Sequence, residues 1–201
     1  MYNLIKKLFD FFFSLFLFTI FLPLILIISL FILFDIGRPI FFLQQRTGKN
    51  GKVFKIIKFR TMNDNVDIDG NFDNDKSRIS FTGKYLRKFS LDELPTLLNI
   101  IYGDMSFVGP RPLLHEYYTD DLYSDFQKER FDVKTGITGW AQINGRNKLT
   151  WEEKFNLDIW YVRNRSFWLD IKIVLKTIIK IFDNRDVDSN NSNTMKKFTG
   201  S

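Results

Sequence analysis

Two adjacent acidic residues, Asp92 and Glu93, are the strongest candidates for chemistry in this 201-residue chain. They lie in the segment 89–95 (FSLDELP), just before a short apolar run at 96–101 that we expect to be helical. A carboxylate can act as a nucleophile and form a covalent intermediate. It can attack a charged phosphate only where neighbouring cations neutralise that charge. We therefore interpret Asp92 as a candidate nucleophile that acts on a phosphate.

The same residues also fit a purely structural role. Ser90 and Glu93 have the spacing of a capping box, in which each side chain binds the other's backbone amide. Pro95 disfavours helical geometry at Leu94, so it is placed more easily at the start of a helix. In both cases Asp92 lies near a helix N-terminus, which favours an ionised carboxylate and attracts phosphate. The local pattern leaves the cap and the catalytic pair as alternatives.

Arg111 stands between Pro110 and Pro112 in a glycine-proline segment. The prolines limit the freedom of the backbone, and a guanidinium can donate two parallel hydrogen bonds to a phosphate. A loop with an ordinary surface arginine is the alternative. His115, the only histidine, is expected to be structural rather than catalytic.

Composition limits the classes of function. The net charge is +6 and the pI about 9.4, which favours anionic partners such as nucleic acid, anionic lipid or phosphorylated substrates. The chain has no cysteine and one histidine, which excludes disulfides, thiol chemistry and zinc sites with two histidines. The sequence contains no P-loop motif. The glycines at 136, 139 and 145 do not have the spacing of a dinucleotide fingerprint.

No charge interrupts the apolar run between Asp10 and Asp35. As a straight helix its 24 positions would measure roughly 36 Å, enough to cross a hydrocarbon core of ~30 Å. A single transmembrane helix is therefore one interpretation. Pro23 lies at the middle and should break or kink the helix. Basic residues flank both ends, which favours a helix that enters and leaves the membrane on one face.

The remaining chain predicts a small β-hairpin and two longer helices. Strands are expected at 39–43 and 53–57 with a turn at 47–52, and a helix at 151–163. A second, amphipathic helix is expected at 168–182, whose apolar face suits either a protein core or the lipid boundary. The polar segment 183–201 is predicted to be a disordered tail.

Five ordered motifs resemble the bacterial sugar transferases, specifically the small monotopic phosphoglycosyl transferases of the PglC type. The resemblance implies an α+β, mostly helical fold with a re-entrant N-terminal membrane helix broken at Pro23, amphipathic interfacial helices and a small β-hairpin. Leu22 stands where relatives often have serine, which makes this bend less secure. The implied domains are 1–36 for the membrane helix, 37–182 for a cytoplasmic-face catalytic domain, and 183–201 for the tail. The motifs are KFRTM (58–62), LDELP (91–95), GDMSFVGPRP (103–112), GITGWAQINGR (136–146) and WEEKFNLDIWY (151–161).

By resemblance, the reaction moves a sugar 1-phosphate from a UDP-sugar to polyprenyl phosphate, usually undecaprenyl phosphate, and releases UMP. The resemblance implies Asp92 as the nucleophile and a contact of Mg²⁺, and Glu93 as a base or an orienting residue. It places the protein on the cytoplasmic face of the bacterial inner membrane, with anionic phospholipid and downstream glycosyltransferases as partners. The candidate phosphate-binding residues are Lys58, Arg87, Arg111 and Arg146.

Two other classes of function remain as alternatives. A membrane-anchored basic module that binds anionic lipid or a partner would explain the charge and the apolar N-terminus, but not the five motifs. A nucleic-acid binder is disfavoured because no recognition motif is present. The sequence does not identify the sugar, nor whether the product enters a protein glycan, an O-antigen or a capsule.

Overall fold

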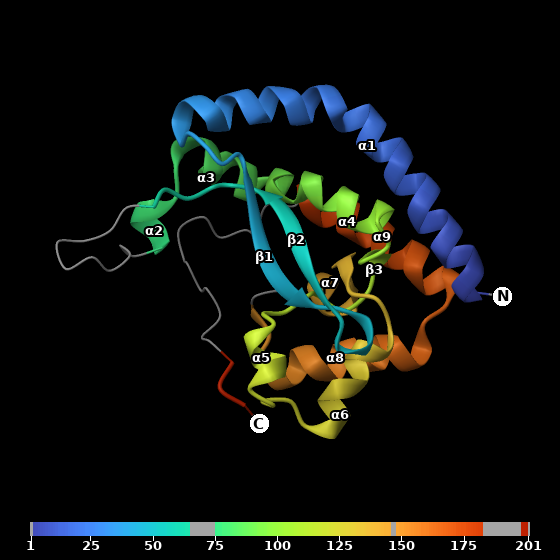
Figure 1. Cartoon of the computed structure of the whole chain (residues 1–201). Coiled ribbons are helices and arrows are strands. Elements are labelled where there is room, and N and C mark those ends of the chain that lie inside the picture. Colours follow the sequence, from blue (N-terminus) through green and yellow to red (C-terminus); the bar gives the residue numbers. More distant parts are fainter. Residues whose placement is uncertain (1, 65–74, 146–147, 183–197, 201) are drawn as a thin grey trace.

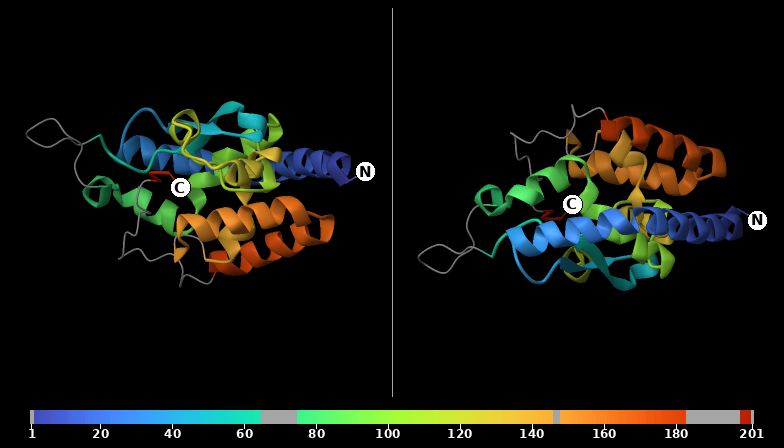
Figure 2. Two further views of the ribbon diagram at one scale, coloured as in Figure 1. Left: turned by 90° about the horizontal axis from the view of Figure 1, so that it is seen from below. Right: turned by 90° about the horizontal axis from the view of Figure 1, so that it is seen from above.

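The computed structural model describes residues 2–64, 75–145, 148–182 and 198–200. One long helix, α1 (Tyr2–Asp35), arches over one side of the molecule (Figure 1). Seen from above, the hairpin of β1 (Phe41–Thr47) and β2 (Val53–Phe59) lies on one flank of α1 (Figure 2, right). The paired helices α8 (Trp151–Asn164) and α9 (Phe167–Phe182) lie on the other flank. The short helices α3 (Phe81–Lys88) and α4 (Leu97–Ile101) lie beneath α1, between these two flanks.

Helix α1 is continuous across Pro23, so the predicted break takes the form of a bend. Figure 1 shows this bend near the middle of the helix. Proline removes a backbone donor and its ring clashes with the preceding turn, which explains the change of direction. With 34 residues, a straight α1 would be about 51 Å long. The bend instead keeps the helix against the protein along its length.

Both ends of α1 are tied to the same protein body. Near the N-terminus, the Tyr2 hydroxyl and Lys6 Nζ donate to Asp170 Oδ2 at 2.9 and 2.7 Å. At the C-terminus, the backbone amide of Thr82 donates to Asp35 Oδ2 at 2.8 Å. These contacts fix the two ends of α1 to one protein body.

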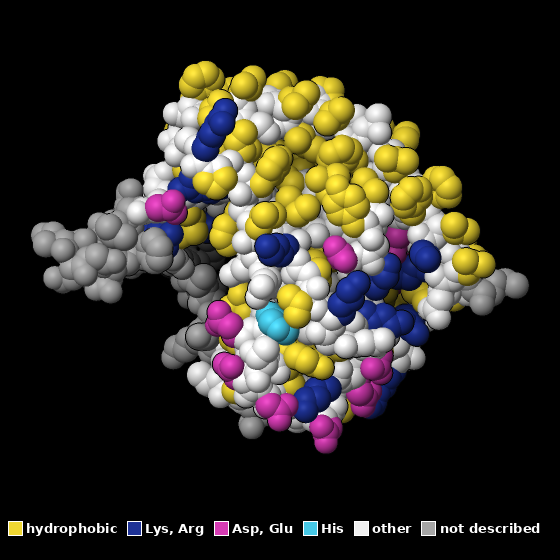
Figure 3. All heavy atoms as spheres, in the orientation of Figure 1, with side chains coloured by type: hydrophobic (Ala, Val, Ile, Leu, Met, Phe, Trp, Pro, Cys, Tyr) yellow, Lys and Arg dark blue, Asp and Glu magenta, His cyan; other side chains and the backbone are white. Residues whose placement is uncertain are grey.

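The outer surface of α1 is apolar and exposed. The helix is long and apolar enough to cross a membrane, yet little of its most hydrophobic stretch is buried inside the protein. Hydrophobic side chains gather over the face that α1 covers and extend toward the hairpin (Figure 3). The inner face of α1 is narrower and buries Ile25, Ile28 and Ile32 against Phe59 and Leu86. One helix thus has a lipid-compatible face and a face that joins the protein core.

The predicted hairpin is confirmed. Strand β1 (Phe41–Thr47) pairs antiparallel with β2 (Val53–Phe59), and a 3-10 turn, η1 (Lys49–Gly51), connects them. The free edge of β2 is bound by side chains. Asn99 accepts from the amide of Ile57 and donates to the Lys55 carbonyl, and the Thr96 hydroxyl donates to the Ile57 carbonyl. These bonds fix the hairpin to the segment that follows the acidic pair.

A second, two-stranded sheet was not expected from the sequence. Strand β3 (Ser106–Val108) pairs parallel with β4 (Gly136–Thr138), which joins two of the glycine-containing motifs. A Cβ added to Gly136 would lie 2.1 Å from the Gly109 amide nitrogen, and one added to Gly109 would lie 2.3 Å from the Lys134 carbonyl oxygen. Close backbone approach therefore explains these glycines without a nucleotide fingerprint.

The helices agree with the two longer predictions and add several short ones. Helix α8 (Trp151–Asn164) begins with a capping box made by Thr150 and Glu153, and α9 (Phe167–Phe182) follows it. One face of α9 joins the core through Ile173, while Leu175, Ile178 and Ile179 are exposed, so its apolar residues are divided between the core and the surface. The shorter helices are α2 (Asp75–Arg78), α3 (Phe81–Lys88), η2 (Leu91–Thr96), α4 (Leu97–Ile101), α5 (Glu116–Thr119), α6 (Asp125–Lys128), η3 (Glu129–Asp132) and α7 (Trp140–Ile143).

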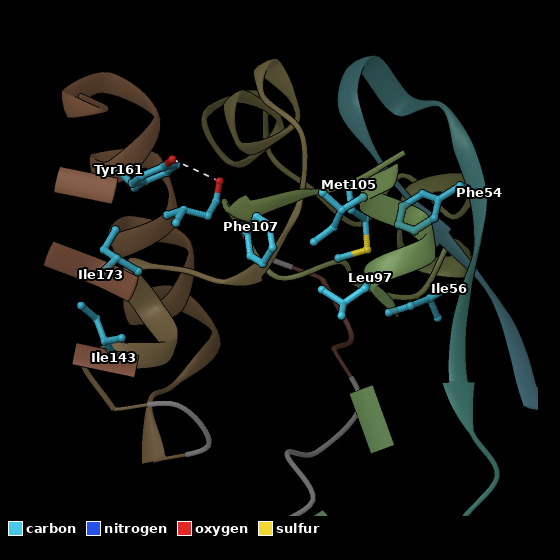
Figure 4. Packing of buried hydrophobic residues seen from close by; sticks show 10 residues of the cluster. Phe54, Ile56, Leu97, Met105, Phe107, Ile143, Tyr161 and Ile173 are labelled. Carbon is cyan, nitrogen blue, oxygen red and sulfur yellow. Dashed lines mark hydrogen bonds between the residues drawn. The ribbon is translucent and has the colours of Figure 1, made fainter. Parts of the chain in front are cut away.

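The main core lies between the hairpin and the α8–α9 pair. Phe54 and Ile56 of β2 reach Leu97 and Met105 from one side, and Tyr161, Ile143 and Ile173 close the other side (Figure 4). The buried Tyr161 hydroxyl donates to the Val108 carbonyl at 3.2 Å, a bond drawn in Figure 4, and to Asp170 Oδ1 at 2.7 Å. A buried hydroxyl needs such partners, and Asp170 thereby connects α8, α9 and α1.

The C-terminal end of the chain enters a separate aromatic cluster. Most of the predicted tail, 183–197 and 201, lies outside the described residues, but Phe198 is only 4% exposed. Its ring lies 5.1 Å from that of Phe155, 5.3 Å from Trp151, 5.5 Å from Tyr123 and 5.7 Å from Tyr117. At Phe198 the chain is therefore packed, which differs from the disorder predicted for this position.

Removing the Phe198 ring should leave a cavity in this cluster. We expect Phe198→Ala to lower the free energy of unfolding by about 3 kcal/mol, measured by denaturant unfolding of the detergent-solubilised protein. Phe81→Ala is the matched control, because the Phe81 side chain is 74% exposed and its loss should cost about 0.5 kcal/mol or less. Equal stabilities for the two variants would show that Phe198 is not part of the core.

Candidate active site

Asp92 and Glu93 lie in the short 3-10 helix η2 (Leu91–Thr96), directly after a sharp change of chain direction. Ser90 precedes this helix with φ 55° and ψ 23°, a left-handed conformation, and makes no capping hydrogen bond through its side chain. The predicted capping box is therefore wrong at this position. Pro95 lies inside the 3-10 helix, which fits the expectation that it disfavours a regular α-helix.

Glu93 is held by two cations from different parts of the chain. Its Oε1 accepts from Lys58 Nζ at 2.6 Å and from Arg111 Nη2 at 2.8 Å, and its side chain is only 13% exposed. Burial alone would raise the pKa of Glu93, but the charges of Arg111 and Lys58 outweigh it and hold the pKa far below its ordinary value. The Glu93 charge in turn raises the pKa of Arg111. Glu93 is consequently a fixed anion and a weak base.

Asp92 lies near the same cations but is not bound by them. No hydrogen bond or ion pair to its carboxylate occurs within the described ranges. Burial and the adjacent Glu93 charge raise its pKa above the ordinary value, and Lys58, Arg111 and Arg87 oppose that rise. The helix end that we expected to keep Asp92 ionised is therefore outweighed by burial. An additional positive charge at the site would favour the ionised, nucleophilic form.

Lys58 and Arg87 are placed by neighbouring segments of the chain. Lys58 is near the end of β2, whose edge is fixed by Asn99 and Thr96. Arg87 lies in the last turn of α3, and its Nε donates to the Thr61 hydroxyl at 2.9 Å. The structure brings both predicted cations to the acidic pair. Arg146, the remaining predicted phosphate ligand, lies outside the described residues.

The loop that carries Arg111 is fixed through its backbone. The Pro110 carbonyl accepts from the amide of Gly136, which continues the contact between β3 and β4. The Arg111 carbonyl accepts from Arg130 Nη2 at 2.7 Å. With the backbone held on both sides of the side chain, the guanidinium of Arg111 can reach Glu93 with little loss of freedom.

Arg130 is itself held by a buried ion pair with Asp158 of α8. The guanidinium donates from Nη2 at 2.8 Å and from Nε at 3.2 Å to Asp158 Oδ2. The two side chains are 0% and 1% exposed. The Arg130 charge favours the ionised carboxylate, yet burial is the larger effect and raises the pKa of Asp158. This pair connects α8, which contains the motif 151–161, to the loop that carries Arg111.

Comparison with known proteins assigns the family. Residues 1–184 match the model of the bacterial sugar transferases. The chain belongs to this family. An uncharacterized sugar transferase EpsL of Bacillus subtilis is 48% identical over 98% of this chain and 97% of its own length. A UDP-glucose:undecaprenyl-phosphate glucose-1-phosphate transferase of Escherichia coli is 40% identical over 81% of this chain, and that match spans 37% of the relative.

Exopolysaccharide production protein ExoY of Sinorhizobium fredii is 39% identical over 78% of this chain and 76% of the relative. Several curated relatives are much longer than this transferase, and the matched part spans about a third of their length. The resemblance inferred from the five sequence motifs is thereby confirmed at the level of the family.

Sequence reasoning missed several residues of the transferase that shape this site. Asn99 and Thr96 bind the edge of β2, and no local pattern marks a side chain that will complete a strand edge. Arg130 and Asp158 are 28 positions apart, so only the fold reveals their pairing. Asp158 does lie within the motif 151–161, which was one available signal. His115 shares a hydrogen bond of 3.0 Å between its Nδ1 and the Thr47 hydroxyl, in agreement with a structural role.

The transferase offers limited protein ligands to a metal ion. Among the described residues, no group of three or more Asp, Glu, His or Cys side chains comes together. Mg²⁺ is often held by one or two carboxylates, with substrate phosphates and water completing the shell. Asp92 fits such a site because no donor within the described part of the chain binds its carboxylate, whereas Glu93 is already bound by Lys58 and Arg111.

The buried ion pair generates a prediction about stability. Asp158→Asn leaves the Arg130 charge buried without its counterion, so we expect the free energy of unfolding to fall by about 3–5 kcal/mol. Glu129→Gln is the control, because it breaks the solvent-screened pair with Arg163 and should lower the stability much less. Denaturant unfolding of both variants in detergent measures the difference. A loss for Asp158→Asn no larger than the control would contradict the role assigned to the pair.

Proposed function

We propose that this chain transfers a sugar 1-phosphate from a UDP-sugar to undecaprenyl phosphate and releases UMP. The observation that carries the proposal is the asymmetry of the acidic pair: Glu93 is bound by two cations, whereas Asp92 beside it has no hydrogen bond or ion pair to any residue that the structure describes. Relatives named as undecaprenyl-phosphate transferases for glucose 1-phosphate and for N-acetylgalactosamine phosphate support the substrate class. Family membership also favours an enzyme over a non-catalytic lipid-binding module.

The proposed reaction has two steps. An Asp92 carboxylate oxygen attacks the phosphorus that carries the sugar, a bond forms to Asp92, and the bond to the bridging oxygen breaks. UMP leaves with the electrons of that bond. A phosphate oxygen of undecaprenyl phosphate then attacks the same phosphorus and releases Asp92. Because both steps are displacements by an anion already ionised, neither requires a base.

Glu93 is assigned a positioning role in this scheme. Its low pKa and its bonds to Lys58 and Arg111 make proton abstraction unfavourable. It fixes the two cations beside Asp92, where they neutralise charge on the phosphate under attack. Arg87 adds a third positive charge near Asp92. The sequence left Glu93 open as a base, an orienting residue or a metal contact, and we propose the orienting role.

Mg²⁺ is the proposed cofactor, with Asp92 as its protein ligand. When bound, Mg²⁺ supplies positive charge that polarises the phosphates of the substrate. The same charge would oppose the effect of burial on the pKa of Asp92. The chain's own cations hold the phosphates in place, and Asp92 supplies the attacking oxygen.

We also propose that α1 enters one leaflet from the cytoplasmic face of the bacterial inner membrane and returns to the same face. Its tethers at Asp170 and Asp35 to one protein body, and its exposed apolar face, support this topology. Leu91 and Leu94 of η2 pack against the inner face of α1, so the acidic pair lies close to the membrane helix. A polyprenyl tail can remain in lipid while its phosphate reaches Asp92. The reaction would be the first membrane step in the synthesis of a capsule, an O-antigen, another exopolysaccharide or a protein glycan.

The covalent step predicts a mass increase on Asp92. We expect wild-type protein with Mg²⁺ and a matching UDP-sugar, but no undecaprenyl phosphate, to gain the mass of one sugar phosphate in mass spectrometry of the intact protein. UDP-glucose, UDP-galactose and UDP-N-acetylgalactosamine form the donor panel. Asp92→Asn should show no adduct because an amide oxygen is a poor nucleophile, and EDTA should prevent the adduct on the wild type.

Asp120→Asn is the control for the substitution, because this carboxylate is exposed on α5's C-terminal side and away from the acidic pair. It should form the adduct as the wild type does. An adduct of undiminished yield on Asp92→Asn would rule out this residue as the nucleophile. An undiminished adduct on the wild type in EDTA would rule out the metal.

A further inference from the structure

Arg46, a residue that the proposed mechanism does not use, lies beside the loop that carries Arg111. It occupies the end of β1, where its backbone forms an isolated bridge with Leu114. The next amide, of Thr47, donates to the Leu113 carbonyl at 3.4 Å. Arg46 Nη1 donates to the Pro112 carbonyl at 3.4 Å. The hairpin therefore holds this guanidinium against the same loop that places Arg111 at the acidic pair.

The charge of Arg46 has no carboxylate partner. None of the ion pairs among the described residues includes Arg46, whose Nη2 instead donates to the neutral amide of Gln44. Its Nε is buried and has no hydrogen-bond partner. Burial, followed by the repulsive charge of Arg111, lowers the pKa of Arg46 to about 10. Burying an unpaired guanidinium next to another is unfavourable unless an anion joins them.

The charges around the acidic pair point to the same kind of ligand. Glu93 accepts from both Lys58 and Arg111. Its negative charge also acts on the guanidinium of Arg46, where it opposes the lowering of the Arg46 pKa. Even with both carboxylates ionised, the cations exceed them by two positive charges. The cations are Lys58, Arg87, Arg111 and Arg46, and the carboxylates are Asp92 and Glu93. Such an excess suits a phosphate group in addition to the one under attack.

In-line chemistry specifies which phosphate that would be. In the first step the UMP phosphate departs from the side of the phosphorus opposite Asp92. In the second step the polyprenyl phosphate must attack opposite the Asp92–phosphorus bond that breaks. The leaving phosphate and the entering phosphate therefore occupy the same position in turn.

We propose that Arg46 and Arg111 together form a phosphate subsite that binds the UMP phosphate in the first step and the polyprenyl phosphate in the second. This inference rests on the two-step function proposed above. Arg111 binds Glu93 and also faces the subsite. Arg46 supplies a second guanidinium, which is not paired with a carboxylate among the described residues and can donate two parallel hydrogen bonds to a phosphate. The ligand class is a phosphate monoester, and nucleotide and lipid supply it alternately.

The test compares Arg46→Gln and Arg46→Lys with Lys52→Gln, an exposed cation on the same hairpin. UMP binding is measured without turnover by isothermal titration calorimetry, and the KM for undecaprenyl phosphate is measured in the full reaction. We expect Arg46→Gln to weaken UMP binding and raise this KM by roughly tenfold or more each. Arg46→Lys should retain part of both, because it keeps the charge but loses the fork. Lys52→Gln should change neither.

Equal unfolding temperatures for the Arg46 variants and the wild type establish that all are folded, and Arg46→Lys provides a second variant if the glutamine variant is unstable. Unchanged UMP affinity in these variants would overturn the proposal. A loss confined to UMP or confined to the lipid would overturn the shared subsite. The UMP measurement involves no catalysis, so it stays informative even if Asp92→Asn proves active and the covalent mechanism fails.

Discussion

The active site depends on one carboxylate that two cations share. Glu93 joins the strand that carries Lys58, the loop that carries Arg111 and its own 3-10 helix at a single point. Without it, the neighbouring positive charges of Lys58 and Arg111 would repel each other at the site. With it, the segments are fixed and positive charge still remains around Asp92, whose carboxylate is not bound by any residue in the described ranges. The chemical division between the two adjacent acids follows from this arrangement.

Helix α1 contacts the segment that carries the acidic pair, and it also presents an exposed apolar face. Its inner face packs against Leu91 and Leu94, the residues on either side of the acidic pair. Its ends are bound to Asp170 and Thr82 of the protein body. Movement of the helix would therefore disturb the site directly. A reaction between a soluble nucleotide sugar and a lipid phosphate requires such a junction, because the two substrates occupy different solvents.

Local sequence patterns predicted the features that depend on nearby residues. The hairpin, the helix at 151–163, the amphipathic helix after it and the bend at Pro23 all follow from periodicity, turn residues or backbone geometry. Asp92, Glu93 and Arg111 were predicted as site residues from residue type and motif, and the structure brings them together. The capping box at Ser90 failed because that residue adopts a left-handed conformation, which local propensity does not predict for serine.

The supporting contacts could not be predicted in the same way. Asn99 binds a strand more than forty residues earlier, and Arg130 is buried although arginine is ordinarily exposed. Phe198 lies in a polar segment, and only the aromatic cluster explains its burial. Arg46 carried no signal beyond its charge. In each case the residue's role is set by the surface it meets after folding.

The covalent, two-step mechanism is tested most directly by the stoichiometry of UMP release. Wild-type protein is mixed rapidly with Mg²⁺ and its UDP-sugar in the absence of undecaprenyl phosphate, and UMP is quantified against active protein. The account predicts a burst of about one UMP per protein molecule, because the sugar phosphate remains on Asp92 until an acceptor arrives. Release of UMP only after undecaprenyl phosphate is added would contradict it and favour direct transfer between the two substrates.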